Sequence, residues 1–192
     1  DWEVIALSKG DHVVGAVELA TGNEELCFIT SDAQLLHFGA DAVRPQGRGG
    51  GGIAGIKLAP KSHVVSFGAF DPTDAVVVTV SGASSALPGT DAGAVKVTVF
   101  ADFPGKGRAT GGVRCHRFLR GEDTLVFAWA GPAPARAASA TGTPIELPEA
   151  VGVETALVVL LGSNRGVRWT GRVRVMRRVF ALFAALTFAV TM

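Results

Sequence analysis

The chain repeats itself, and this internal repeat constrains the fold more than any other feature of the sequence. The motif Leu-Ser-Lys-Gly-Asp-His-Val-Val at 7–14 shares its pattern with 58–65 and 118–125, and each copy reads as a strand end, a polar turn and a new apolar strand. Successive copies lie 51 and 60 residues apart. The glycine-rich segments 46–53 and 106–113 align at the same offset of 60. A period of roughly 50 to 60 residues with four short strands per unit predicts propeller-type blades in an all-β fold.

The repeat also sets the expected domain organisation. The strands are predicted at 26–30, 35–38, 53–58 and 64–70 in one unit, and at 76–80, 95–100, 113–118 and 125–129 in the next. The expected parts are the end of a preceding blade (1–22), a blade (23–72), a second blade (73–131) with a loop insertion (82–93), a closing segment (132–153) and a tail (154–192). About two and a half blades cannot close a ring, so we expect further blades before Asp1 or a partner that covers the open edge.

The tail differs in composition from the rest of the chain. Residues 1–154 carry twelve Lys and Arg against seventeen Asp and Glu, whereas 155–192 carry six arginines and no acid. The alternation in Val167–Val175 is typical of an edge strand or a basic amphipathic arm, and an unstructured extension is the alternative. The apolar run Val179–Val190 is shorter than the roughly 18 residues that a membrane helix needs, so a membrane partner is not expected.

The sequence predicts neither a catalytic site nor a metal site. Gly47, Gly49 and Gly52 fit a GxGxxG spacing, but a strand rather than a helix is expected to follow, which argues against a dinucleotide site. The four histidines stand alone, and no carboxylate pair suggests acid–base catalysis. Two cysteines, Cys27 and Cys115, are 88 residues apart and are predicted to be core thiols in a cytoplasmic, reducing compartment. The chain has no tyrosine, and its start without methionine indicates a fragment.

Basic residues in glycine-rich loops are the strongest functional signal. Equivalent loops of successive blades are expected on one rim, where cations along a convex edge suit the phosphates of duplex DNA. The predicted DNA-binding residues are Arg44, Gln46, Arg48, Lys96, Lys106, Arg108, Arg114, Arg117 and Arg120. Two alternatives remain, namely that these are ordinary solvated turns or that the rim binds another protein.

These residues also carry a family resemblance. The segments 28–36, 43–48, 105–114 and 121–123 resemble the C-terminal domain of the A subunit of bacterial type IIA DNA topoisomerases, the gyrase A and topoisomerase IV A group. The resemblance implies a β-pinwheel, a propeller-like ring of usually about six blades that bends DNA around its rim. It also implies a cytoplasmic, nucleoid-associated protein whose partners are duplex DNA, the A-subunit core and an ATPase B subunit. The catalytic tyrosine and the use of ATP and Mg²⁺ belong to other parts of such an enzyme, so no cofactor is expected in this chain.

One departure from the family pattern concerns DNA wrapping. Gyrase A subunits carry a Q-R-R-G-G-R-G box, and the resemblance implies that this box is needed for chiral wrapping of DNA. The matching positions here are Gln46, Arg48, Gly49, Gly50 and Gly52. Gly47 and Gly51 stand where the other two basic residues belong, so the chain resembles a topoisomerase IV-type or degenerate version.

Overall fold

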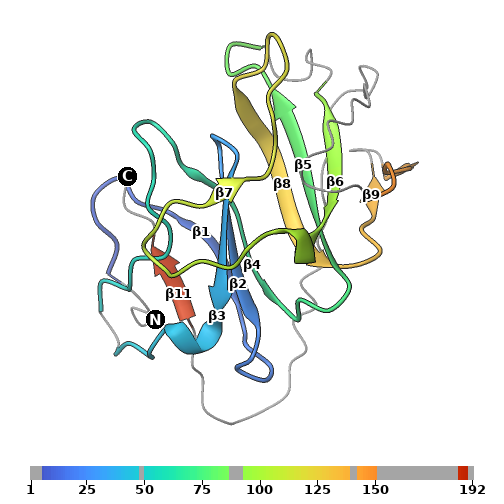
Figure 1. Ribbon diagram of the computed structural model, residues 1–192. Coiled ribbons are helices and arrows are strands. Elements are labelled where there is room, and N and C mark those ends of the chain that lie inside the picture. Colours follow the sequence, from blue (N-terminus) through green and yellow to red (C-terminus); the bar gives the residue numbers. More distant parts are fainter. Residues whose placement is uncertain (1–5, 48–49, 87–92, 139–141, 151–185, 190–192) are drawn as a thin grey trace.

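The computed structural model describes residues 6–47, 50–86, 93–138, 142–150 and 186–189, and these form an all-β protein (Figure 1). Two larger antiparallel sheets stand side by side, and short two-stranded pairs lie at either end. The described part contains two 3-10 turns, η1 (Ala40–Ala42) and η2 (Phe100–Asp102), and no α-helix. No helix in that part is long and apolar enough to cross a membrane.

The first sheet has the strand order β4-β2-β3-β7. Its strands are β2 (Glu25–Thr30), β3 (Gln34–Gly39), β4 (Val64–Phe70) and β7 (Val113–Arg114). Both central strands are buried on both faces, as their near-continuous apolar sequences require. In the turn between them, Ala33 has a φ of 61°. The Thr30 hydroxyl donates a hydrogen bond of 2.6 Å to the Asp32 carboxylate and closes this turn.

The second sheet has the strand order β6-β5-β8 among the described residues. Its strands are β5 (Ala75–Gly82), β6 (Val95–Val99) and β8 (Thr124–Pro132). All eight residues of β5 are buried, so this valine-rich strand lies at the centre of a sheet that is covered on both faces.

Three apolar clusters cover the faces of the two larger sheets, as expected for stacked blades. The first lies between the two sheets and includes Ile29, Leu35, Val77 and Phe100. The second lies on the outer face of the first sheet, around Phe28, and the third covers the outer face of the second sheet with the valines of β5 and β6. Each sheet is therefore packed on both faces, which is the arrangement of blades in a propeller.

Six of the eight expected strands are confirmed within a few residues, but the third strand of each unit was predicted wrongly. Segment 53–58 forms no strand, and only Ile56 makes an isolated parallel bridge, to Thr110. The expected strand 113–118 is limited to β7, and it pairs with β3 of the first sheet through Leu35↔Val113. The second repeat thus donates a strand to the first blade, a long-range pairing that local alternation does not specify.

The remaining strands lie at the two ends of the chain. Strand β1 (Val13–Val17) pairs antiparallel with β11 (Leu186–Ala189), which falls within the tail. The segment Val167–Val175, for which an edge strand, a basic arm and an unstructured extension are the alternatives, lies outside the described part of the chain. Strands β9 (Ala137–Ala138) and β10 (Pro144–Ile145) pair within the expected closing segment.

Candidate nucleic-acid interface

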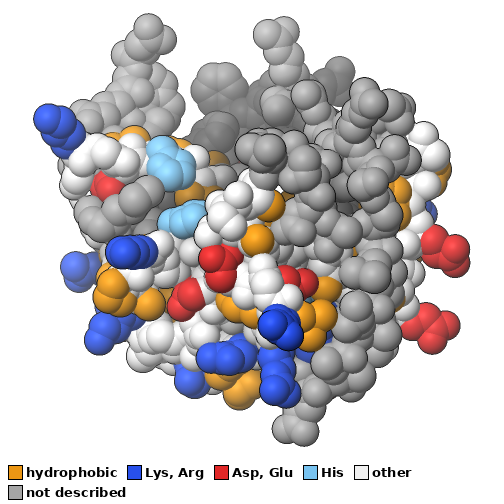
Figure 2. Space-filling view, turned by 90° about the horizontal axis from the view of Figure 1, so that it is seen from above, with side chains coloured by type: hydrophobic (Ala, Val, Ile, Leu, Met, Phe, Trp, Pro, Cys, Tyr) orange, Lys and Arg blue, Asp and Glu red, His pale blue; other side chains and the backbone are white. Residues whose placement is uncertain are grey.

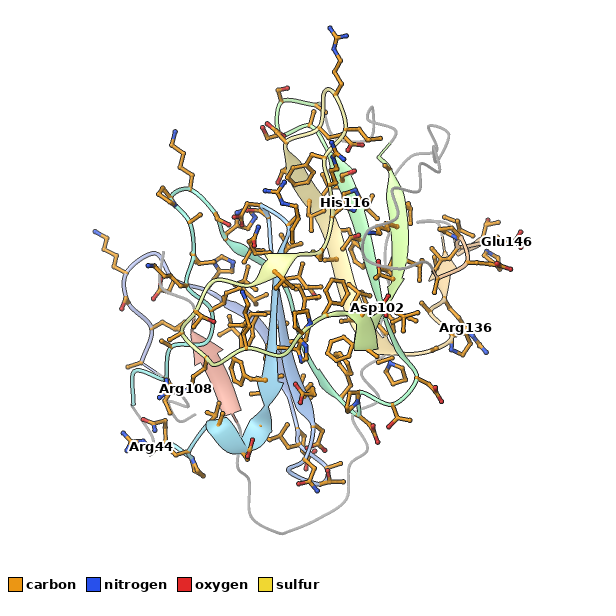
Figure 3. The ribbon with its side chains drawn as sticks, in the orientation of Figure 1. Arg44, Asp102, Arg108, His116, Arg136 and Glu146 are labelled. Atoms are coloured by element: carbon orange, nitrogen blue, oxygen red, sulfur yellow. The ribbon has the colours of Figure 1, made fainter. Side chains whose placement is uncertain are left out.

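One segment of the second repeat crosses from the second sheet to the edge of the first sheet and back again. We call this segment, residues 103–117, the basic strap (Figures 1 and 3). In the sequence, the strap begins after η2, contains β7 and ends before β8. In space, it runs alongside β3. It carries the exposed cations Lys106, Arg108, Arg114 and Arg117. Because so few of its residues are in regular structure, side chains from both sheets must hold it in place.

The beginning of the basic strap is fixed by His37 on β3. Nε2 of this buried imidazole donates to the carbonyl oxygen of Phe103 at 3.0 Å, and Nδ1 lies 2.8 Å from a carboxylate oxygen of Glu25. The backbone N–H of Lys106 donates to the carbonyl oxygen of His37 at 3.1 Å. The imidazole also packs against the ring of Phe100, with 4.6 Å between centroids. His37 therefore contacts the strap directly before its first two cations.

The middle of the basic strap joins the end of the first glycine-rich loop. The backbone N–H of Lys57 donates to the carbonyl oxygen of Thr110 at 3.0 Å, and that of Ala109 donates to Gly55. The Thr110 hydroxyl donates to the carbonyl of Gly107 at 2.6 Å and closes the turn that contains Arg108. The segment that leads out of the first glycine-rich loop, residues 55–57, is thus hydrogen-bonded to the second glycine-rich loop.

The end of the basic strap is anchored on both sheets. A Cβ on Gly112 would collide with the carbonyl group of Leu35, so the strap approaches β3 as closely as a backbone can. The thiol of Cys115 donates to the carbonyl of Ala33 at 3.3 Å, and burial raises the pKa of this thiol to about 12. On the second sheet, Nδ1 of His116 lies 2.8 Å from Oγ1 of Thr79. The inward-facing Cys115 and His116 leave their neighbours Arg114 and Arg117 exposed.

Most of the predicted DNA-binding residues lie on the surface. Arg44 and Gln46 follow η1 and are exposed, and Figure 3 places Arg44 on the same side of the molecule as Arg108. Arg120 is exposed in the turn before β8. Of the box-like loop, Gly50 donates to the carbonyl of Gly47 at 3.1 Å and Gly52 has a φ of 80°. Arg48 and Gly49 lie outside the described residues.

Lys96 is a correction to the sequence analysis. Its side chain is on β6 opposite Thr79, and the residue is only 4% exposed. Burial lowers the pKa of its ammonium group. Lys96 was predicted as a DNA contact because the stretch 96–120 is locally basic, whereas both faces of this sheet are covered, so Lys96 cannot reach a phosphate in this conformation.

Lys57 is a cation that the sequence analysis missed. It is exposed, and its backbone is hydrogen-bonded to the basic strap beside Arg108. Residues 53–58 were predicted as a strand of their own blade, which gave no reason to associate Lys57 with the loops. The alignment of the two glycine-rich segments was the only available signal.

Charge is unevenly distributed over the surface. In the view from above, Lys and Arg side chains gather toward one side and the lower edge, and acidic side chains lie at the centre and the opposite edge (Figure 2). One acid lies close to the basic strap. Burial alone would raise the pKa of Asp32, but hydrogen bonds from Ser62 and Thr30 lower it, and the charge of Arg114 lowers it further. Asp32 is thus an ionised, internally bonded carboxylate. No group of His, Cys, Asp and Glu in the described part is arranged to hold a metal ion.

Comparison with known proteins finds relatives of this two-blade region. Residues 24–71 and 89–128 match the family described as DNA gyrase C-terminal domain, beta-propeller. This part of the chain is similar to the C-terminal β-propeller domain of DNA gyrase A subunits. The chain is 34% identical over 109 residues to the A subunit of DNA gyrase from Klebsiella oxytoca, a match that covers 57% of this chain and 11% of the relative. It is 35% identical over 103 residues to the topoisomerase protein TopoM of Mycolicibacterium smegmatis, a match that covers 54% of this chain and 13% of the relative.

A solved structure supports the fold of this chain. The C-terminal domain of DNA topoisomerase IV superimposes with a TM-score of 0.59 at 21% identity, covering 86% of this chain and 47% of that chain. The propeller-like fold expected from the repeats is therefore confirmed. The chain spans only about a tenth of the length of the curated relatives above and about half of this structural neighbour.

Proposed function

We propose that this domain binds duplex DNA along the basic strap and the adjoining loop, without reading its sequence. The observation that carries the proposal is the hydrogen bonding of residues 55–57 to the second glycine-rich loop, which brings exposed cations of both repeats onto one edge of the first blade. The proposed phosphate contacts are Arg44, Lys57, Lys106, Arg108 and Arg114, with Gln46, Arg117 and Arg120 flanking them. Arg48 is proposed as a further contact from the sequence alone. Phosphate contacts of this kind position DNA but do not specify bases.

The local geometry suits a backbone partner rather than a base edge. The described part presents no α-helix that could enter the major groove, and direct readout by a helix is therefore not proposed. The glycines around Arg108 carry no side chains that would hold a phosphate away: nothing lies within 4 Å of a Cβ on Gly107 or Gly111. A duplex can thus approach the strap backbone closely.

The larger assembly is also part of the proposal. We place strand cleavage in an A-subunit core and ATP hydrolysis with Mg²⁺ in a B subunit, in a cytoplasmic, nucleoid-associated enzyme to which this domain presents DNA. Gly47 and Gly51 replace two basic residues of the gyrase box, which supports bending of DNA with weaker chiral wrapping.

Salt dependence tests the proposal against its alternative, a propeller that binds protein. The affinity for a fluorescent duplex should fall roughly 150-fold to 500-fold between about 50 and about 200 mM salt if four to five phosphates are contacted. Two duplexes of unrelated sequence should bind equally well. An absence of duplex binding at low salt would contradict the proposal and favour the protein-binding alternative.

A further inference from the structure

We infer that His37 is a positioning residue for DNA binding, which holds the first cations of the basic strap in place without touching DNA itself. This inference rests on the proposed function. It follows from the location of the imidazole, which is 9% exposed and lies under the strap, where it cannot meet a phosphate.

His37 is bonded to the basic strap on both sides of the turn that leads to Lys106. Its ring reaches forward to the carbonyl of Phe103, and its own carbonyl receives the N–H of Lys106. Between these two bonds lies Gly105, where an added Cβ would sit 3.4 Å from Cε1 of the imidazole. The chain from Phe103 to Lys106 is therefore wrapped around one side chain of the neighbouring blade.

The chemistry of the two ring contacts requires an imidazole. A carbonyl oxygen and a carboxylate can only accept hydrogen bonds, so both ring nitrogens donate when His37 is protonated and Glu25 is ionised. The side chain of Glu25 is 24% exposed, so the pair lies at the margin of the core. The contact between Nδ1 and the Glu25 carboxylate orients the ring so that Nε2 faces Phe103.

Comparison of the two repeats shows that a histidine bonded to a neighbouring segment is not a general feature of the blade. The pairing Cys27↔His37 in the first sheet corresponds to Val77↔Thr98 in the second, at the 50-residue offset between β2 and β5. Thr98 is 1% exposed, and its side chain is too short to make the two contacts that His37 makes. His37 thus replaces a small residue only in the blade against which the basic strap lies.

The test combines two measurements on the whole chain. His37→Phe retains a ring against Phe100 but removes both side-chain hydrogen bonds, and His63→Phe, at an exposed histidine, is the matched control. Hydrogen exchange followed by mass spectrometry should show the peptide containing Phe103–Lys106 exchanging at least about tenfold faster in His37→Phe than in the control. The affinity for duplex DNA should fall about threefold to tenfold, the loss expected for one or two net hydrogen bonds.

Two further variants separate positioning from general destabilisation. His37→Gln keeps an N–H donor for Phe103 and should recover part of the affinity. If His37 acts through the cations, combining His37→Phe with Arg108→Ala should cost less affinity than the sum of the single changes. Should His37→Phe fail to fold, His37→Gln combined with Arg108→Ala provides the same comparison.

The two ways of failing are distinguishable. If the parent chain does not bind duplex DNA, the proposed function is wrong. If the parent chain binds DNA but His37→Phe binds equally well, or if its loss is additive with that of Arg108→Ala, the inference about His37 is wrong and the proposed function stands.

Discussion

The imidazole of His116 and the hydroxyl of Thr79 are hydrogen-bonded across the boundary between the basic strap and the second sheet, with 2.8 Å between Nδ1 and Oγ1. Both residues are buried, at 5% and 1% exposure. This contact fixes the strap directly between the exposed Arg114 and Arg117, so the fold and the candidate site depend on the same hydrogen bond.

The protonation of His116 should make folding stability depend on pH. Burial lowers the pKa of His116 below its ordinary value of 6.5, while Glu122 opposes this shift and Lys96 adds to it. Between the folded and the unfolded pKa, the unfolded chain binds more protons, so stability falls as the pH drops below 6.5 and levels off below the folded pKa. Urea unfolding between about pH 7.5 and about pH 5.5 should show this loss in the parent chain.

His116→Gln is the control for this pH dependence. The amide can bond Thr79 but cannot titrate, so the variant should lose less stability than the parent over the same pH interval. Equal losses in the two proteins would show that other groups account for the pH dependence.

Gly112→Ala should unfold the basic strap, whereas Gly111→Ala should not. The added Cβ at Gly112 would collide with the carbonyl oxygen of Leu35 and lie 2.5 Å from its carbonyl carbon, and these backbone atoms cannot move aside. We expect a loss of about 2 kcal/mol or more in urea unfolding. A Cβ at Gly111 meets nothing within 4 Å, so that variant should stay within about 0.5 kcal/mol of the parent. Similar losses in both variants would contradict the close approach to β3.

Arg108→Ala should weaken duplex binding and reduce the steepness of its salt dependence by about 0.9, the value for one phosphate contact. Arg136→Ala is the matched control, because Arg136 lies on the opposite side of the molecule from Arg108 in Figure 3. We also expect Arg108→Ala to cost more affinity than Arg48→Ala, since Arg48 has fewer basic neighbours in the sequence. The reverse order would make the degenerate box the primary contact.

Lys96→Met should leave duplex affinity and its salt dependence at the values of the parent chain. The side chain is buried, and methionine retains most of its volume, so the fold should tolerate the change. Lys106→Met, at an exposed position on the basic strap, is the comparison and should weaken binding. A marked loss of affinity in a folded Lys96→Met protein would show that β6 opens when DNA binds.

Truncation after Glu154 should loosen β1 and leave the two larger sheets intact. From composition alone, the tail is predicted to be dispensable, but β11 pairs with β1 through Val13↔Ala189, Ala16↔Thr187 and Val17↔Leu186. Amide exchange should therefore accelerate in Val13–Val17 while β2 and β5 keep their protection. Unchanged exchange in β1 would support the compositional expectation that the tail is foreign to the fold.

The sequence by itself determined the local features of this protein. The repeat, the polar turns and the alternation of short apolar runs depend on neighbouring residues, and they located six strands and an all-β, blade-type fold. The same reasoning located the exposed cations at Arg44, Lys106 and Arg108, because glycine-rich turns keep their side chains on the surface.

Only the tertiary structure decided which strands and loops meet. Lys96 was assigned to the surface because it belongs to the locally basic stretch 96–120, and local charge does not show whether a neighbouring layer covers both faces of β6. The partners of His37 and His116 lie 66 and 37 residues away in the chain, and the donation of β7 to the first sheet is equally non-local. Such contacts depend on how whole blades pack, since each sheet buries its apolar faces against its neighbours, and no local pattern encodes that choice.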